Sequence, residues 1–270
     1  MTRLLSGAVL VGAAVALVWL ATPAVFFVFA EATLVLAFIE YRRLAEAVGL
    51  PVPAVAGGIA TVAASVGVSS WRWIDDTVVG MAIALDAVLM SALIVLAMLA
   101  LASWRGGRDA IGRASAATFP LLYLGLPTGA LIAIRQMKGS RGLFLLMLTV
   151  IVSDTAQYYT GRRFGRRQLA PEVSPKKTIE GAIGGFVFGT LLLTVVGRWW
   201  LPDVPLPIRV VLGATVVALG IGGDLFESML KRSAGVKDSS SLIPGHGGVL
   251  DRLDALLFAA PVYYLVLKYV

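Results

Sequence analysis

Long apolar segments follow one another along almost the whole chain and constrain its fold more than any other feature. An α-helix needs roughly 20 mainly apolar residues to cross the hydrocarbon core of a bilayer. Segments of that kind lie at about 4–21, 23–40, 54–70, 78–102, 114–134, 142–160, 181–200, 207–227 and 250–269. Backbone polar groups inside a bilayer must be satisfied within a helix or a closed barrel. The sequence therefore predicts an all-α, polytopic integral membrane protein with about nine transmembrane helices.

The composition excludes an ordinary soluble domain and several kinds of chemistry. Of the 270 residues, 58% are hydrophobic and 14% are charged, whereas soluble domains have about 45–50% and about 25%. The chain has no cysteine, which excludes disulfides, thiolate nucleophiles and zinc sites with sulfur ligands. Its one histidine, His246, excludes a multi-histidine site within a single chain. A bound metal would therefore have oxygen ligands, which Mg²⁺ prefers.

Lysine and arginine are distributed unevenly between the predicted loops. With nine spans, sixteen of the 23 basic residues fall on the side of the N-terminus and seven on the opposite side. Cytoplasmic loops are rich in Lys and Arg, so we expect a multi-pass protein of the cell (inner) membrane with a cytoplasmic N-terminus. The formal net charge of +7 fits contact with anionic headgroups of the lipid bilayer. It does not indicate nucleic acid, because the basic residues lie between apolar spans.

Polar residues are concentrated in the second half of the chain. Before residue 141 the loops are short, and after it come two long polar loops, 161–180 and 228–249, both on the predicted cytoplasmic side. We therefore divide the chain into an N-terminal transmembrane region of about five helices, 1–140, and a C-terminal catalytic transmembrane region of about four helices, 141–270. The catalytic site is expected at the cytoplasmic mouth of the C-terminal helices.

Acidic residues at the adjoining ends of the last two spans are the first candidates for a site. Ionisable residues within spans are rare and mark functional sites. The end of the eighth span presents two acids, a hydroxyl and an amine on one helix face, at Asp224, Glu227, Ser228 and Lys231. The ninth span begins with Asp251 and Asp254 on the same side of the membrane. Four carboxylates at one depth would suit Mg²⁺ bridging to a phosphate.

Other acidic residues within the predicted spans are more isolated. Asp154 has Tyr158 one helical turn later on the same face, within DTAQYYTGRRFG. A single acid–base pair near the end of a span is more often an ordinary ion pair than a site, but carboxylates, glycines and basic residues gather here in one stretch. Glu31 and Asp86 stand alone, and we interpret them as structural polar contacts or as misplaced span ends.

The two polar loops carry groups that would bind phosphate. In GRRFGRRQLAPEVSPKKTIEG, Pro175 fixes a turn and Thr178 can cap the next helix, so Lys176 and Lys177 are held in place. The second loop, KRSAGVKDSSSLIPGHGGVLDRLD, allows backbone amides to approach an anion closely. It also contains Lys237, Asp238 and His246. The simpler alternatives are a basic cytoplasmic loop and a flexible linker.

The stretch from Ser228 to Asp254 resembles the signature of the phosphatidate cytidylyltransferase (CDP-diacylglycerol synthase) family. It follows the pattern S-x-x-x-K-R-x-x-x-x-K-D, then PGHGG, then D-R-x-D. GGDLFES, SPKKTIEG and DTAQYYTGRRFG are similar to further blocks of that family, so the resemblance covers about 154–254. The N-terminal half resembles the family only in being hydrophobic. One departure is DTAQYYTG in place of D-x-x-A-Y-x-x-G, which moves the alanine by one position.

The resemblance implies transfer of the cytidylyl group of CTP to phosphatidic acid, which gives CDP-diacylglycerol and pyrophosphate for phospholipid biosynthesis. It implies Mg²⁺ as the cofactor, with Asp224 and Asp251 at the positions of the metal ligands, and also a homodimer and a second, monovalent cation such as K⁺. Together with the residue patterns it gives a predicted site. The catalytic residues are Asp224, Lys231, Asp251 and Asp154; the substrate-binding residues are Lys176, Lys177, Ser228, Arg232, Lys237, Asp238, His246 and Arg252; the metal ligands are Asp224, Asp251, Glu227 and Asp254.

Two other functions stay open at this point. Ionisable residues within spans also mark the paths of ion-coupled transporters, but here they gather at one membrane face and the sequence has no visible inverted repeat. Another CTP-dependent lipid enzyme, either a polyprenol-type kinase or an archaeal-lipid cytidylyltransferase, is the nearer alternative. The product distinguishes the kinase, which transfers the γ-phosphoryl group instead of the cytidylyl group.

Overall fold

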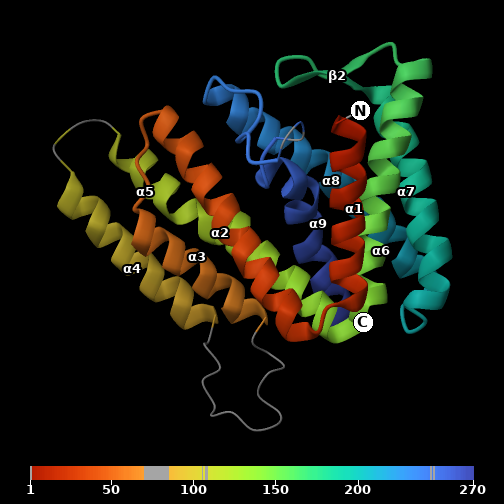
Figure 1. Ribbon diagram of the computed structural model, residues 1–270, viewed down its shortest axis with the longest axis horizontal. Helices are drawn as coiled ribbons and strands as arrows, with labels where there is room; N and C mark the ends of the chain where they lie inside the picture. The colour runs from red at the N-terminus through yellow and green to blue at the C-terminus, as the bar shows by residue number, and fades with distance from the viewer. Residues whose placement is uncertain (1, 70–84, 105, 107–108, 244, 246) are drawn as a thin grey trace, which may run out of the picture.

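The structure is a computed structural model that describes residues 2–69, 85–104, 106, 109–243, 245 and 247–270. Its elements are α1 (Thr2–Leu20), α2 (Pro23–Ala47), α3 (Ala54–Ser69), α4 (Leu85–Ser103), α5 (Ala110–Pro120), the π-helical turn η2 (Leu121–Gly125), α6 (Leu126–Phe164), β1 (Gln168–Ala170), β2 (Ser174–Thr178), α7 (Ile179–Trp200), α8 (Leu206–Ser233) and α9 (Leu250–Tyr269). One short hairpin interrupts the helices (Figure 1). The all-α fold class is confirmed.

The number of membrane-spanning helices is not confirmed as nine. Among the described residues, five helical segments are long and apolar enough to cross a membrane: Pro23–Ala47, Leu85–Ser103, Ala110–Phe164, Ile179–Trp200 and Leu206–Ser233. The apolar segment Val11–Leu20 of α1 and the whole of α3 are shorter. Helix α9 has charged residues at both of its ends. The beginning of the fourth predicted span, 78–84, lies outside the described residues.

The fifth and sixth predicted spans, 114–134 and 142–160, belong to one helical segment that is kinked at Gly139. The backbone of Gly139 has φ 66° and ψ −164°, in a region that glycine adopts far more readily than other residues. This glycine allows the chain to change direction where the sequence predicted a loop. The predicted boundary between the two regions, at residue 140, falls at this kink.

The helices are arranged in two groups (Figure 1): α2–α5 together with the beginning of α6, and the rest of α6 together with α7–α9. One core cluster joins the end of α1 to α6, α7, α8 and α9, around residues such as Leu145, Leu193 and Tyr263. The Tyr263 hydroxyl donates to the carbonyl of Gly142 at 3.0 Å, which fixes α9 against α6. A second cluster packs α2 against α5, η2 and the beginning of α9. Helix α9 therefore contacts both groups.

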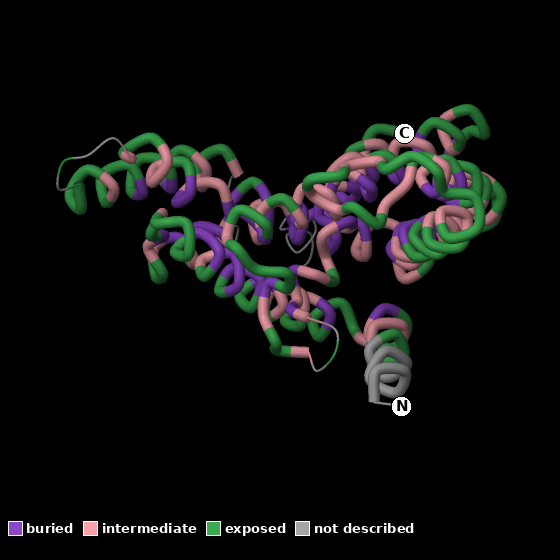
Figure 2. Tube along the Cα trace, turned by 90° about the horizontal axis from the view of Figure 1, so that it is seen from above, coloured by how far each residue is buried: buried purple, intermediate pink, exposed green. Residues whose placement is uncertain are grey.

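Much of the helix surface is exposed (Figure 2), and many of the exposed residues have large apolar side chains. Phe29 on α2, Leu93 and Met98 on α4, and Phe188 and Leu191 on α7 are all more than half exposed. Apolar surface of this extent is unfavourable in water and favourable against lipid chains. Together with the apolar helices, it identifies a membrane protein.

Glycines allow the helices of the second group to approach closely. A Cβ atom at Gly184 would lie 2.4 Å from Oγ1 of Thr160 on α6, and one at Gly223 on α8 would lie 2.4 Å from the carbonyl oxygen of Asp254 on α9. Small residues of this kind let helix backbones meet in membranes. The glycines of GAIGGFVFGT in α7 thus form a packing surface, and Gly223 brings the acidic ends of α8 and α9 together.

Candidate active site

The candidate site lies where the hairpin, the end of α6, the end of α8 and the beginning of α9 meet. A cleft of about 370 Å³ opens there. It is lined by Asp154, Gln157, Tyr158, Gly161 and Arg162 of α6, by Lys176, Lys177 and Thr178 of the hairpin, and by Gly181 and Asp224. Five of the lining side chains are charged, so the cleft suits a polar, charged ligand.

The hairpin holds the two lysines against the cleft. SPKKT forms strand β2 rather than the expected turn, and it pairs antiparallel with β1, with Gln168 opposite Thr178. As expected, Thr178 caps α7, because its hydroxyl accepts from the backbone N–H of Gly181 at 3.1 Å. Lys177 on this strand has its Nζ 2.6 Å from Oδ2 of Asp224, an ion pair that connects the hairpin to α8.

Asp154 and Tyr158 both line the cleft from α6, which agrees with their predicted position on one face of the helix. Oδ1 of Asp154 accepts from Nε2 of Gln157 at 2.9 Å. Arg162, which also lines the cleft, donates to the Tyr158 hydroxyl at 3.3 Å. Asp154 on α6 and Asp224 on α8 thus both line the cleft.

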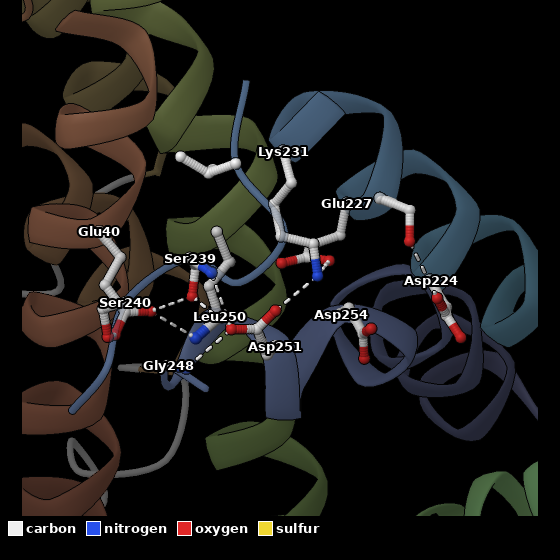
Figure 3. A network of polar contacts seen from close by, with 12 residues as sticks. Glu40, Asp224, Glu227, Lys231, Ser239, Ser240, Gly248, Leu250, Asp251 and Asp254 are labelled. Carbon is white, nitrogen blue, oxygen red and sulfur yellow. Dashed lines mark hydrogen bonds and ion pairs between the residues drawn. The ribbon is translucent and has the colours of Figure 1, made fainter. Parts of the chain in front are cut away.

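A second polar cluster, formed by Glu227, Lys231 and Asp251, lies beside the cleft (Figure 3). The ammonium of Lys231 is 2.5 Å from Oδ1 of Asp251 and also forms an ion pair with Glu227 one turn earlier on α8. The Glu227 side chain is fully buried, and the other two side chains are 11% and 5% exposed. Buried charges need such partners, because burial without them is strongly unfavourable.

Asp251 is the most extensively bonded carboxylate of this cluster. Its Oδ2 accepts from the backbone N–H of Gly248 at 2.7 Å, and from the N–H and the hydroxyl of Ser239 at 2.9 Å and 2.8 Å. These donors all belong to the loop before α9. Asp251 therefore fixes both the loop and Lys231.

Asp254 lies between the cleft and this cluster (Figure 3). It is near enough to Asp224, Asp154 and Lys231 to interact with them electrostatically, and its Oδ1 accepts from the backbone N–H of Ala255 at 2.7 Å. Asp224 in turn accepts a long hydrogen bond, 3.4 Å, from Ser228. The carboxylates thus divide into a cleft group and a group around Lys231.

The structure does not bring the four predicted metal ligands to a single point. Within the described part of the chain, no three acidic side chains are arranged to hold one metal ion. Lys231 lies between Glu227 and Asp251, and Lys177 contacts Asp224. The donor chemistry nevertheless suits Mg²⁺, because the carboxylates offer hard oxygen atoms beside a cleft. The assignment of individual ligands stays a prediction.

The remaining predicted site residues lie around the loop before α9. Arg232 donates to the carbonyl of Val236 at 3.0 Å and closes the end of α8. Lys237, Asp238 and Arg252 are exposed. His246 lies outside the described residues. None of these predicted roles is tested by the geometry.

Glu40 was not among the residues predicted from the sequence, although it has an extensive hydrogen-bond network. This side chain near the end of α2 is 3% exposed. It accepts from the hydroxyls of Ser239 and Ser240 at 2.9 Å and 2.6 Å and from the backbone N–H groups of Val249 and Leu250 at 3.0 Å and 2.8 Å. The signal was present, since a carboxylate at the end of an apolar span is itself unusual. Its partners, about 200 residues further on, gave no indication of the contact.

Comparison with known proteins connects this site to a family. The chain matches the model of the cytidylyltransferase family over residues 1–270. It belongs to this family. The residues between 154 and 254 that resemble the family therefore have a common origin with it, and the fold places many of them around one cleft.

Three curated relatives are similar over part of the chain. The chain is 40% identical over 161 residues to the phosphatidate cytidylyltransferase of Thermotoga maritima, covering 57% of this chain and 59% of the relative. It is 38% identical over 151 residues to that of Aquifex aeolicus, covering 56% of each, and 46% identical over 134 residues to that of Haemophilus influenzae, covering 45% of each. The chain thus spans about half the length of the curated relatives it matches.

Proposed function

We propose that this chain transfers the cytidylyl group of CTP to phosphatidic acid. In this reaction a phosphate oxygen of the lipid attacks the α-phosphorus of CTP, and the bond between that phosphorus and the bridging oxygen of the β-phosphate breaks. The products are CDP-diacylglycerol and pyrophosphate. The observation that carries the proposal is the arrangement of Asp224, Lys231 and Asp251 beside a cleft with two lysines, in a member of the cytidylyltransferase family.

The cleft residues suit this reaction because it needs positioning and charge neutralisation more than covalent chemistry. Lys176, Lys177 and Arg162 supply cationic donors for phosphate oxygens. The phosphate nucleophile is already largely ionised at neutral pH, so no strong general base is needed. Lys231 holds Asp251 in a fixed orientation at the side of the cleft. Ser228, Arg232, Lys237, Asp238, His246 and Arg252 complete the proposed substrate-binding set.

Mg²⁺ is part of the proposal. Asp224 and Asp251 are the proposed ligands, with Glu227 and Asp254 as further carboxylates near them. When bound, the ion would neutralise charge on the phosphates of CTP. The Asp224 side chain is 30% exposed and lines the cleft, so an ion in the cleft can reach it. A monovalent cation such as K⁺ and a homodimer belong to the same proposal.

The proposed location is the cell (inner) membrane, with the N-terminus and the site on the cytoplasmic side. CTP is a cytoplasmic substrate, and phosphatidic acid presents its headgroup at the membrane surface. Arg162 and Arg163 lie in the last turn of α6, and Arg166 and Arg167 lie between α6 and the hairpin. Basic residues at this level attract anionic lipid headgroups. These observations support a site that opens towards both substrates.

The test uses the purified full chain in phosphatidylcholine vesicles that contain phosphatidic acid. CTP labelled at the α-phosphate should transfer its label to lipid, CTP labelled at the γ-phosphate should release it as pyrophosphate, and EDTA should stop both. Label from the γ-phosphate in lipid would instead show a kinase. Absence of lipid label from either nucleotide would overturn the proposed function. Solute flux without CTP would favour a transporter.

A further inference from the structure

Glu40 links the N-terminal helices to the polar cluster around Asp251. It comes from α2, whereas its partners Ser239, Ser240, Val249 and Leu250 all come from the loop before α9 and from the beginning of α9 (Figure 3). Each of its two oxygen atoms accepts two hydrogen bonds. A surface carboxylate does not acquire such a set by chance, because each buried donor must be oriented towards it.

The first role of Glu40 is to cap α9 from another helix. The first N–H groups of a helix have no partners within the helix, and the N-cap residue of α9, Val249, has no polar side chain to supply one. Glu40 accepts from the N–H of Val249 and from that of Leu250. A carboxylate at this position also interacts favourably with the positive end of the helix dipole. The beginning of α9, which carries Asp251, is therefore fixed by a residue of α2.

The second role passes through Ser239. Its hydroxyl oxygen is 2.9 Å from Oε2 of Glu40 and 2.8 Å from Oδ2 of Asp251. A serine hydroxyl has one hydrogen to donate, so the two carboxylates share one donor. Gly248 packs tightly against Glu40, since a Cβ atom at this position would lie 2.5 Å from both carboxylate oxygens of Glu40. Any shift of Glu40 would therefore move the groups that orient Asp251.

We propose that Glu40 is a positioning residue of the active site. It holds Ser239 and Ser240 in the loop and the backbone of Val249 and Leu250, so that Asp251 meets Lys231 in a fixed geometry. As far as turnover is concerned, this inference rests on the proposed function. It also gives the N-terminal half of the chain, from which no site residue was predicted, a task in the chemistry.

The test compares Glu40→Gln, Glu40→Ala and Glu40→Asp in the purified full chain. Loss of groups that orient a metal ligand or a reacting group typically reduces activity about 10–100-fold. We expect kcat to fall by that amount in Glu40→Ala and by about tenfold in Glu40→Gln, while the KM values for CTP and phosphatidic acid change less. The amide of Gln can accept at only one of its two atoms. Glu40→Asp keeps the carboxylate and should restore part of kcat.

Glu31→Gln is the matched control. Glu31 lies on the same helix and accepts from the hydroxyl of Ser65 at 2.7 Å, but its partner belongs to α3. This variant should keep kcat. If it loses as much activity as Glu40→Gln, general loosening of α2 explains both and the proposal is overturned.

Limited trypsin digestion gives a readout that does not depend on turnover. Lys237 lies in the loop that Glu40 holds, and cleavage after it reports opening of that loop. We expect cleavage of Glu40→Gln and Glu40→Ala to be about five times faster than in the parent, at a temperature well below the unfolding transition of every variant. Unchanged cleavage together with kcat within twofold of the parent would overturn the proposal. If the parent makes no CDP-diacylglycerol, the proposed function fails, and digestion alone still decides whether Glu40 holds the loop.

Discussion

The ammonium of Lys231 on α8 lies 2.5 Å from Oδ1 of Asp251 in the first turn of α9. The same ammonium contacts Glu227, whose side chain is fully buried. One cation therefore compensates two carboxylates from two helices and joins the ends of those helices. Removing one partner of a buried charged group leaves the others uncompensated, which destabilises a protein by about 3–5 kcal/mol.

We predict that Lys231→Met abolishes CDP-diacylglycerol synthesis and lowers the unfolding temperature, because Glu227 and Asp251 lose their cation. Adding Glu227→Gln to Lys231→Met should restore part of the stability, since one buried charge is then removed, without restoring activity. Thermal unfolding of the detergent-solubilised variants, at one fixed heating rate, measures this. Equal unfolding temperatures for the single and the double variant would contradict the coupling.

Substitutions of Asp224 and Asp251 should both lower turnover but should differ in their effect on stability. Both Asp224→Asn and Asp251→Asn should reduce turnover at least about a hundredfold, as expected when a metal ligand or an oriented charge is lost. Only Asp251→Asn should also lower the unfolding temperature, because Asp251 is 5% exposed and compensates Lys231, whereas Asp224 is 30% exposed. Titration of activity with Mg²⁺ would show a higher requirement for any variant that retains measurable turnover.

Asp203→Asn is the matched control for Asp224→Asn. Asp203 also pairs with a lysine, Lys138, at 3.6 Å, but it lies between α7 and α8 at the other end of α7. The Asp203→Asn variant should be as active as the parent. Near-normal incorporation of labelled CTP into lipid by Asp224→Asn would remove Asp224 from the proposed metal site.

Gly248→Ala should lower turnover strongly, although it adds only one methyl group. The added Cβ would lie 2.1 Å from the Ser239 hydroxyl and 2.5 Å from both carboxylate oxygens of Glu40, so the loop must move. We expect turnover to fall at least about tenfold, since misplacement of a catalytic group by about 1 Å can reduce a rate a hundredfold. Gly222→Ala on α8 is the control, because its Cβ would meet nothing within 4 Å. Equal activity of the two variants would show that the loop adapts.

The sequence predicted what depends on local patterns and missed what depends on distant contacts. The long apolar segments predicted helices, and the position of Thr178 directly before such a segment predicted that it caps the next helix. Helix α2 continues to Ala47, past the predicted end at residue 40, because it leaves the apolar span but still buries Tyr41, Leu44 and Ala45, while Arg42 and Glu46 form an i,i+4 ion pair on its surface. The role of Glu40 was not predictable, since its partners are about 200 residues away.

The cysteine-free sequence allows a direct test of the proposed orientation, because a single introduced cysteine can be labelled without background. Helix α7 has 22 residues and is about 33 Å long at 1.5 Å per residue, enough to place its two ends on opposite sides of a bilayer. Arg166→Cys, on an exposed residue before the hairpin, should react with an impermeant maleimide only after spheroplasts are permeabilised. Asp203→Cys, at the other end of α7, should react in intact spheroplasts, since the Asp203 side chain is 72% exposed. The reverse pattern would place the site outside the cytoplasm, where CTP is not available, and would contradict both the orientation and the proposed reaction.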